Sequence, residues 1–473
     1  MNKIAKNFIA VFVGTMSSKV LSLLMVVYLA RVLGPNDFGI INFSSAFIIY
    51  FSMLGSLGLQ SLGIVEVAKN KKELRRYVNE ITSLKIVLSL ISFALLIVTI
   101  LFIDKDLATK ITIIITGVSV ILNSFLLDWV FNALQEMKYS SQSQIISSSI
   151  ALVIVVICIS TGIFTKVYLA PVATNIAMLC ANIYLFRIYR KKTNNKFSFV
   201  FSIDRYKDLL TRSWPFFFSG VFATINGNID TIILGFMKGN YEVGLYNAAY
   251  KIVLILIQIV TFIFTPIFPV LIEYYKERKL DKLSVIINKT RKIILMLVMP
   301  LTVAAILLSE IIINTLYGSK YEGVGFAFTI LLLYVCLLFI RELYGYQLTA
   351  FGYQKKYMNI VLISSSFNIV LNIILIPKFG IVGSAFTTLV SEIINIFFMV
   401  NSARKIVVFK YDNSYIIKMI FASMLMAVSI IVFRNFTLNA YILSGIAAVV
   451  YFAAIFILKV ITLEEIKSLK KAE

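Results

Sequence analysis

Long apolar stretches separated by short polar connections dominate the hydropathy pattern of this chain. Each stretch has the length of a helix that crosses the hydrocarbon core of a bilayer, about 20 residues. Short segments of alternating polarity, which would predict a β-barrel, are absent from the pattern. The pattern therefore predicts an all-α polytopic membrane protein with about 14 transmembrane helices. The expected spans are 8–30, 40–65, 82–103, 111–133, 145–164, 167–186, 214–237, 245–270, 292–316, 325–350, 358–376, 381–402, 415–433 and 438–458.

The distribution of charge gives the expected topology. The chain is 60% hydrophobic and 14% charged, with a net charge of +22, which in a soluble protein would suggest nucleic-acid binding. Here most lysines and arginines lie in every second connection, starting with the N-terminal one, which is the positive-inside pattern. We therefore expect a multi-pass protein of the cytoplasmic membrane with both termini cytoplasmic. The runs Arg187–Lys192 and Lys276–Lys282 are expected to contact anionic lipid headgroups.

Several kinds of chemistry are excluded by composition. The chain has no histidine and three cysteines. All three cysteines lie within apolar spans, so they indicate packing rather than a disulfide or a metal site. No segment has the GxxxxGK[ST] pattern of a nucleotide-binding P-loop, and no catalytic constellation is found. We expect no enzyme activity and no cofactor, with a proton or sodium ion as the only candidate coupling ion.

The connections divide the chain into a six-plus-six-plus-two plan. We expect an N-terminal six-helix lobe over 1–195, a second six-helix lobe over 196–403, and a C-terminal helix pair with a tail over 404–473. A short repeat supports this plan: GPNDFGIIN at 34–42 matches GNYEVGLYN at 239–247 in both glycines, the acid and the final asparagine. The glycines permit a tight turn, and the acid and the asparagine are expected to cap the following helix. Repeats six spans apart have the same orientation and are typical of transporters, whereas a scaffolding protein needs no such symmetry.

Charged residues inside the apolar spans are the candidates for a functional site, because each costs roughly 2.5–3.5 kcal/mol on insertion scales. The cations are Lys19, Lys251 and Arg341, which together predict a cationic cavity suited to a phosphate-bearing substrate. Each also has a structural alternative: an acidic partner for Lys19, an ion pair for Arg341, and an extended side chain that reaches the membrane surface for Lys251. A fourth cation, Lys85, is expected to reach the cytoplasmic surface in this way.

The acids within or beside the spans are Asp230, Glu392, Glu342 and Asp128. They either pair with the cations or bind a coupling proton or sodium ion. Glu342 follows Arg341 directly, and because neighbours on a helix point about 100° apart we do not expect these two simply to neutralise each other.

Three segments resemble a known family. The segment ARVLGPNDFG at 30–39 resembles a signature near the start of the Wzx-type polysaccharide flippases of the MOP superfamily. The segments at 230–235 and 244–251, DTIILG and GLYNAAYK, resemble a second motif of that family, and PKFGIVGSA at 377–385 resembles a third. The resemblance runs nearly end to end.

This resemblance implies a two-lobed fold similar to MATE transporters and a flippase function. The implied substrate is an oligosaccharide linked to undecaprenyl diphosphate, carried from the inner to the outer leaflet for O-antigen or capsule synthesis. It also implies a cationic central cavity, with Lys19 and Lys251 matching by position and Arg341 and Arg31 as further substrate-binding candidates. The expected partners are this lipid-linked oligosaccharide, membrane lipids and a polysaccharide polymerase.

Two other functions remain open at this stage. A MATE-like multidrug antiporter should prefer cationic drugs and so carry acids rather than cations in its cavity. A membrane enzyme acting on lipid-linked sugars would need catalytic carboxylates in its external loops, and the acids there are scattered.

Overall fold

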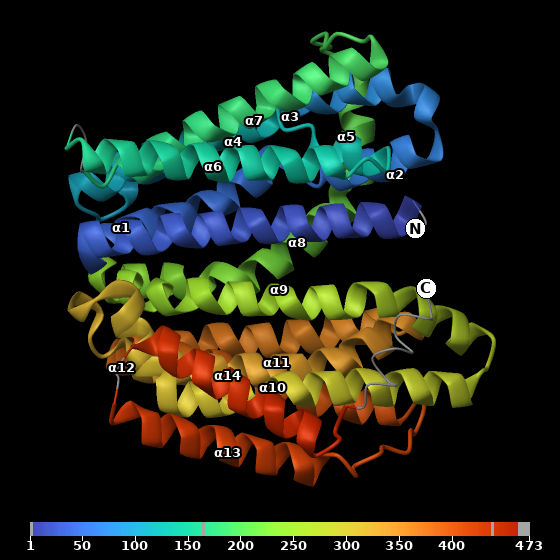
Figure 1. Cartoon of the computed structure of the whole chain (residues 1–473). Coiled ribbons are helices and arrows are strands. Elements are labelled where there is room, and N and C mark those ends of the chain that lie inside the picture. Colours follow the sequence, from blue (N-terminus) through green and yellow to red (C-terminus); the bar gives the residue numbers. More distant parts are fainter. Residues whose placement is uncertain (1–2, 163–165, 437–438, 462–473) are drawn as a thin grey trace. The chain divides into compact units, whose positions relative to one another are not determined.

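The computed structural model describes residues 3–162, 166–436 and 439–461, with side chains for all of these except residues 3–10, 219, 222, 223 and 226. Every regular element in these ranges is a helix (Figure 1). Eleven helices in the described part of the chain are long and apolar enough to cross a membrane. The all-α, multi-pass architecture expected from the sequence is therefore confirmed.

The chain divides into two compact units, Met1–Asn247 and Ala248–Glu473. The first unit contains α1 (Lys3–Ser56), α2 (Leu59–Lys69), η1 (Lys71–Glu73), α3 (Leu74–Phe102), α4 (Leu107–Ser124), α5 (Asp128–Ala133), α6 (Lys138–Ser160), α7 (Leu169–Thr193), α8 (Ile203–Met237) and the first turns of α9 (Asn240–Lys276). The second unit contains the rest of α9, then α10 (Leu280–Tyr317), η2 (Ser319–Tyr321), α11 (Val324–Ala350), α12 (Gln354–Arg404), α13 (Ile416–Arg434) and α14 (Ala440–Ile457).

Two of the longest helices are interrupted by a glycine whose backbone is not helical. In α1 this residue is Gly34 (φ 78°), directly before Pro35. In α12 it is Gly380 (φ 53°), three residues after Pro377. A positive φ is readily accessible only to glycine, so each interruption is encoded locally. The expected spans 8–30 and 40–65 thus lie on the two sides of one interruption, and 358–376 and 381–402 on the two sides of the other.

Two of the expected spans are each divided between two helices. The span 40–65 is divided at Leu57 and Gly58, both with positive φ, before α2 begins. A Cβ on Gly58 would lie 2.6 Å from the backbone N of Phe217, so the bend lets α8 approach closely. The span 111–133 is divided between the end of α4 and the start of α5 at Asp128.

The core of the first unit near these bends is built around Trp129. Its side chain is fully buried among apolar residues of α2, α3, α5, α7 and α8, including Leu59, Ile81 and Leu185. Gly63 of α2 allows this packing, because a Cβ there would lie 2.5 Å from the indole ring. A separate cluster in the second unit joins α10 to the C-terminal pair α13 and α14.

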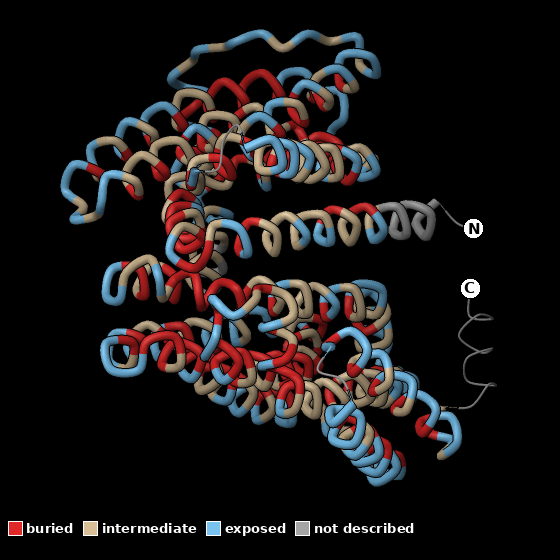
Figure 2. The backbone as a smooth tube through the Cα atoms, turned by 60° about the vertical axis from the view of Figure 1, so that its left-hand side comes forward, coloured by how far each residue is buried: buried red, intermediate tan, exposed pale blue. Residues whose placement is uncertain are grey.

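Many large apolar side chains remain exposed along the middle of the helices. On α3, Leu90, Ile91, Leu95 and Val98 are each about half exposed. Figure 2 shows buried and exposed residues alternating along most helices. Continuous exposed apolar surface of this kind is expected where lipid, not water, surrounds the helices.

The connection from α7 to α8 is fixed onto the first unit. Its backbone N–H groups at Ser198 and Val200 donate to Asn79 Oδ1 (3.1 Å) and Ser83 Oγ (2.9 Å) of α3. Beyond it, Arg205 of α8 pairs with the buried Glu80. These contacts attach the start of α8 to the first unit.

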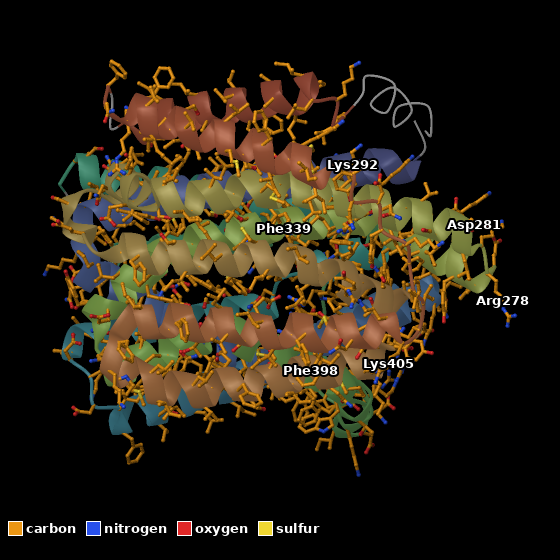
Figure 3. All side chains as sticks on the ribbon, turned by 90° about the horizontal axis from the view of Figure 1, so that it is seen from below. Arg278, Asp281, Lys292, Phe339, Phe398 and Lys405 are labelled. Carbon is orange, nitrogen blue, oxygen red and sulfur yellow. The ribbon has the colours of Figure 1, made fainter. Side chains whose placement is uncertain are left out.

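Basic residues gather at one end of the second unit. Arg278 lies in the tight turn between α9 and α10, with Lys292 and Lys405 toward the same end and Phe339 among the helices (Figure 3). The charge pattern leads us to expect the connections 271–291 and 403–414 on the cytoplasmic side. The first was expected to be partly helical, and only Glu277–Lys279 lie outside its helices.

Candidate functional site

A buried ionic cluster in the second unit joins α11 to α12. Arg341 Nε lies 2.6 Å from Glu392 Oε1, and its Nη1 lies 3.0 Å from Glu342 Oε1. Arg341 is 8% exposed and Glu392 is 3% exposed, so the charges are withdrawn from solvent. Asn395, one turn beyond Glu392, lies with its Nδ2 3.4 Å from the other carboxylate oxygen.

Arg341 pairs with its neighbour Glu342 as well as with Glu392, so the two neighbours meet but do not form a simple neutral pair. Their Cα–Cβ directions differ by about 100°, but the long arginine side chain reaches back to its neighbour. Gly345 leaves room for this arrangement: a Cβ there would lie 3.3 Å from Glu342 Oε2 and 3.1 Å from the Tyr357 ring.

The Arg341 guanidinium therefore pairs with two carboxylates, those of Glu342 and Glu392. When both carboxylates are ionised, the cluster carries one surplus negative charge in a buried environment, where an unpaired charge is costly. An arrangement of this kind can hold a proton or a small cation on the carboxylate that Arg341 satisfies less completely. It also means that Arg341 binds a further anion only by releasing one of its present partners.

Lys19 of α1 is exposed and, among the described residues, forms no ion pair. The preceding Ser18 points elsewhere, with its hydroxyl 2.8 Å from that of Ser148 on α6. The side of α1 that carries Ser18 thus packs against α6, whereas the Lys19 ammonium group is exposed and available to an anion.

Two further cations named from the sequence lie on α1 and α9. Arg31 is exposed three residues before the interruption at Gly34, and Lys251 is partly buried on α9. Both have interactions with other residues of the chain.

Asp230 is buried near the end of α8 and accepts a hydrogen bond from the Tyr246 hydroxyl on α9 (2.9 Å). One residue further along each helix, Asn247 Nδ2 donates to Thr231 Oγ1 (3.1 Å). Tyr50 of α1 is close enough to interact electrostatically with Asp230. Neither tyrosine could be singled out from the sequence, because an isolated tyrosine in an apolar span has no distinguishing pattern.

Asp128 begins α5 and accepts a hydrogen bond from the Trp129 backbone N–H at 2.8 Å. It interacts electrostatically with Lys85 of α3. Lys85 was expected to reach the membrane surface, and this is wrong: the side chain is 1% exposed and donates to the Asn123 carbonyl oxygen at 2.9 Å. α4 ends at Ser124, and the same carbonyl also accepts the Leu126 backbone N–H at 3.3 Å, so the lysine adds a further hydrogen bond at this helix end.

The repeated segments contact each other reciprocally. A Cβ on Gly39 would lie 1.7 Å from the carbonyl oxygen of Asn240, and a Cβ on Gly244 would lie 1.8 Å from that of Pro35. Asn240 occupies the position in its repeat that Pro35 occupies in the other. The segments therefore pack against each other through equivalent positions.

The turn glycines predicted from the repeat are confirmed, and the predicted capping is not. Gly34 and Gly239 both have positive φ. Asn42 Nδ2 donates to the Phe38 carbonyl (2.8 Å) and Asn247 Nδ2 to the Val243 carbonyl (3.0 Å), four residues back in each helix. The amides therefore bond within the helix instead of satisfying its first N–H groups.

No group of three or more cysteine, aspartate or glutamate residues within the described ranges could hold a metal ion. Within the first unit the candidates are an exposed lysine on α1, an aspartate–tyrosine pair on α8 and α9, and a lysine–aspartate pair; the arginine–glutamate cluster belongs to the second unit.

Fold and charges together define a multi-pass, all-helical membrane protein with buried and intramembrane charges. Residues 4–275, more than half of the chain, match the family model described as polysaccharide biosynthesis protein, and the chain belongs to this family.

Individual relatives extend this comparison. The chain is 32% identical over 169 residues to the "Probable flippase AglR" of Haloferax volcanii, covering 34% of this chain and 35% of the relative. It is 23% identical over 392 residues to the capsular polysaccharide biosynthesis protein CapF of Staphylococcus aureus, covering 82% of this chain and 96% of CapF. The chain spans about half or less of the length of the first archaeal relatives it matches.

Solved structures show the fold. The chain is similar to the inward closed conformation of the lipid II flippase MurJ, with a TM-score of 0.74 and 20% sequence identity, over 94% of this chain and 98% of MurJ. An inward-facing MATE family transporter of the MOP superfamily matches with a TM-score of 0.64 and 16% identity, over 82% of this chain and 95% of the transporter.

Proposed function

We propose that this protein is a flippase that carries an oligosaccharide linked to polyprenyl diphosphate from the cytoplasmic to the outer leaflet of the cytoplasmic membrane. The observation that carries this proposal is the likeness of nearly the whole chain to a lipid II flippase, in a chain of the polysaccharide biosynthesis family. The relatives described as a flippase and as a capsule biosynthesis protein are consistent with such a substrate.

The proposed topology has fourteen crossings and two cytoplasmic termini. The interruptions at Gly34 and Gly380 divide α1 and α12 into two crossings each. α8, at 35 residues, supplies a further crossing. The alternation of basic connections supports the orientation.

The proposed mechanism is alternating access between six-helix bundles. Lys19, Lys251 and Arg31 replace water around the diphosphate, because ammonium and guanidinium groups form charge-assisted hydrogen bonds with phosphate oxygens. The reciprocal contact of the repeats at Gly39 and Gly244 closes the outer end in the inward-facing state and separates when the substrate leaves.

Arg341 takes part in this mechanism only when one of its carboxylates is neutralised. A proton on Glu342 releases Arg341 Nη1 for the substrate while Glu392 keeps Nε, so proton uptake and anion binding are linked. Outward movement of the substrate is also favoured by a negative interior, by about 2.3 kcal/mol per charge per 100 mV.

Transport in proteoliposomes tests the function directly. Wild-type protein should move a fluorescent undecaprenyl-diphosphate oligosaccharide between leaflets, and Lys19→Ala should lose this activity. Movement of cationic dyes by wild type, with no movement of the lipid-linked sugar, would overturn the proposal in favour of a multidrug antiporter. Chemical conversion of the labelled substrate by the purified protein would instead indicate an enzyme.

A further inference from the structure

A pocket of about 510 Å³ lies in the first unit, between the end of α4, one face of α7 and the connection that follows α7. Its α7 residues recur at helical spacing from Leu179 through Ile183 to Arg190. At 1.5 Å per residue this face extends for about 16 Å along the helix. The pocket is therefore elongated along α7, and its far end is the end that the charge pattern places at the cytoplasmic surface.

The two ends of the pocket differ in chemistry. One end is apolar and contains Leu122, Leu179 and Ile183, the last two of which are nearly half exposed. Phe197, in the connection, closes over the wall by packing edge-on against Phe186, with ring centroids 6.3 Å apart. This end offers an apolar groove that opens toward the lipid-facing surface.

The other end is basic and has no acidic residue. Arg187, Arg190 and Lys196 line it, and all three are exposed. None of them forms an ion pair with any described residue, whereas nearby Lys192 pairs with Glu136 at 2.5 Å. Three cations without counter-ions beside an apolar groove are complementary to an anionic amphiphile.

A buried polar atom in the pocket wall also lacks a hydrogen-bond partner in the described structure. This atom is Asn182 Oδ1, on a residue that is 3% exposed. Buried polar atoms in native proteins nearly always have a partner, so this orphaned oxygen indicates a missing ligand or water. The buried Tyr189 also lines the pocket, near Thr193 and Asn195, and its hydroxyl can donate to a phosphate or ester oxygen.

The second unit has a pocket at the corresponding place. There the chain leaves α12 and returns over the end of α11, enclosing about 290 Å³ between Tyr344, Gln347, Arg404 and Tyr411. Gln347 Nε2 is again buried without a partner. This pocket is smaller, and Arg404 is the single cation that lines it. Both repeats therefore have a pocket at this position, but only the pocket beside α7 is lined by three cations.

We propose that the pocket between α4 and α7 holds one anionic phospholipid from the cytoplasmic leaflet. Its phosphate lies among Arg187, Arg190 and Lys196, and one acyl chain follows the groove past Ile183. The lipid would fill the space between α7 and the connection at Phe197 and so stabilise the first unit. This inference requires that the protein spans a membrane with the end of α7 at the cytoplasmic surface, and it does not depend on the proposed transport function.

Lipid binding to the purified, delipidated full chain tests the proposal. Native mass spectrometry with dioleoyl phosphatidylglycerol should show one tightly retained lipid, at least 10-fold tighter than dioleoyl phosphatidylcholine. The triple variant R187Q/R190Q/K196Q should lose this preference. The matched control K276Q/R278Q/K282Q removes three charges from another basic connection and should keep it.

A second variant separates the groove from the charges. Ile183→Trp fills the apolar end while leaving all three cations in place, and it should weaken phosphatidylglycerol binding at least fivefold. Equal retention of the two phospholipids by wild type, or unchanged phosphatidylglycerol binding in the triple variant, would overturn the proposal. Displacement of phosphatidylglycerol by equimolar undecaprenyl phosphate would also overturn it and assign the pocket to a polyprenyl lipid.

Discussion

Gly39 and Gly244 are equivalent positions of two repeated segments, and each is the packing partner of the other. A Cβ on Gly39 would lie 2.9 Å from the backbone N of Gly244, and a Cβ on Gly244 would lie 3.1 Å from that of Gly39. Backbone-to-backbone contact of this kind leaves no room for any other residue. The contact explains why the repeat conserves its glycine spacing within this chain while most other positions differ.

Substituting either glycine should separate the segments. Gly39→Ala and Gly244→Ala place a methyl group onto a carbonyl oxygen, and overpacking of this type typically costs 1–3 kcal/mol. We expect transport to fall at least 10-fold in each variant, measured as flipping in proteoliposomes. Gly445→Ala is the matched control, because a Cβ there has nothing within 4 Å. Wild-type transport in both variants would show that the contact has no role in the cycle.

The arginine–glutamate cluster should respond unequally to removal of its members. Arg341→Gln leaves two buried carboxylates without a cation, and breaking a buried pair in this way costs about 3–5 kcal/mol. Glu342→Gln leaves Arg341 with Glu392 and should cost far less. Thermal unfolding in detergent compares the two variants. Equal loss of stability would mean that Glu342, not Glu392, is the essential partner.

Replacing Lys19 should lower transport without changing thermal stability, whereas replacing Lys85 should lower thermal stability. Lys19→Ala alters an exposed side chain, so we expect unchanged thermal stability and at least 10-fold lower transport. Lys85→Met removes a buried cation that donates to the Asn123 carbonyl and interacts with Asp128, and we expect this loss to cost about 1–3 kcal/mol. The exposed Lys418 provides a control, and its replacement by Ala should change neither property. A destabilised Lys19→Ala protein would assign that lysine a structural role.

The ion pair between Glu66 and Arg212 predicts a pH dependence at low pH. The pKa of Glu66 is lowered from 4.5 to about 2, first by the hydrogen bond from Arg212 and next by that from Lys69. Because the folded-state pKa is the lower one, this stabilisation is complete above about pH 4.5 and is lost as the pH falls toward 2.

Thermal unfolding of wild type and Glu66→Gln across this range measures the effect. We expect the variant to be less stable by about 1 kcal/mol at pH 7, with the difference falling below pH 4.5 and vanishing only below about pH 2. Glu277→Gln, which removes an exposed partner of Lys279, should show no difference at any pH. A constant difference between wild type and Glu66→Gln would exclude the ion pair as its source.

The helices, their glycine interruptions and the basic ends could be predicted from the sequence, because each depends on local properties. Apolar length sets a membrane-spanning helix, and the positive φ of Gly34 and Gly239 follows from turn signals in the segments themselves. The boundary errors at Leu57–Gly58 and between α4 and α5 come from packing: α8 approaches the first bend closely, and the buried Lys85 donates to the end of α4 at the second.

Only the tertiary structure decided which charges meet. Nothing in the spacing of Arg341 and Glu392 fixes their pairing, because it depends on how α11 packs against α12. The same holds for the burial of Lys85, the tyrosines around Asp230 and the pocket beside α7, each of which joins segments far apart in the chain. The sequence by itself determined what crosses the membrane and where its charges lie; packing determined which of them are neutralised and which stay available to a ligand.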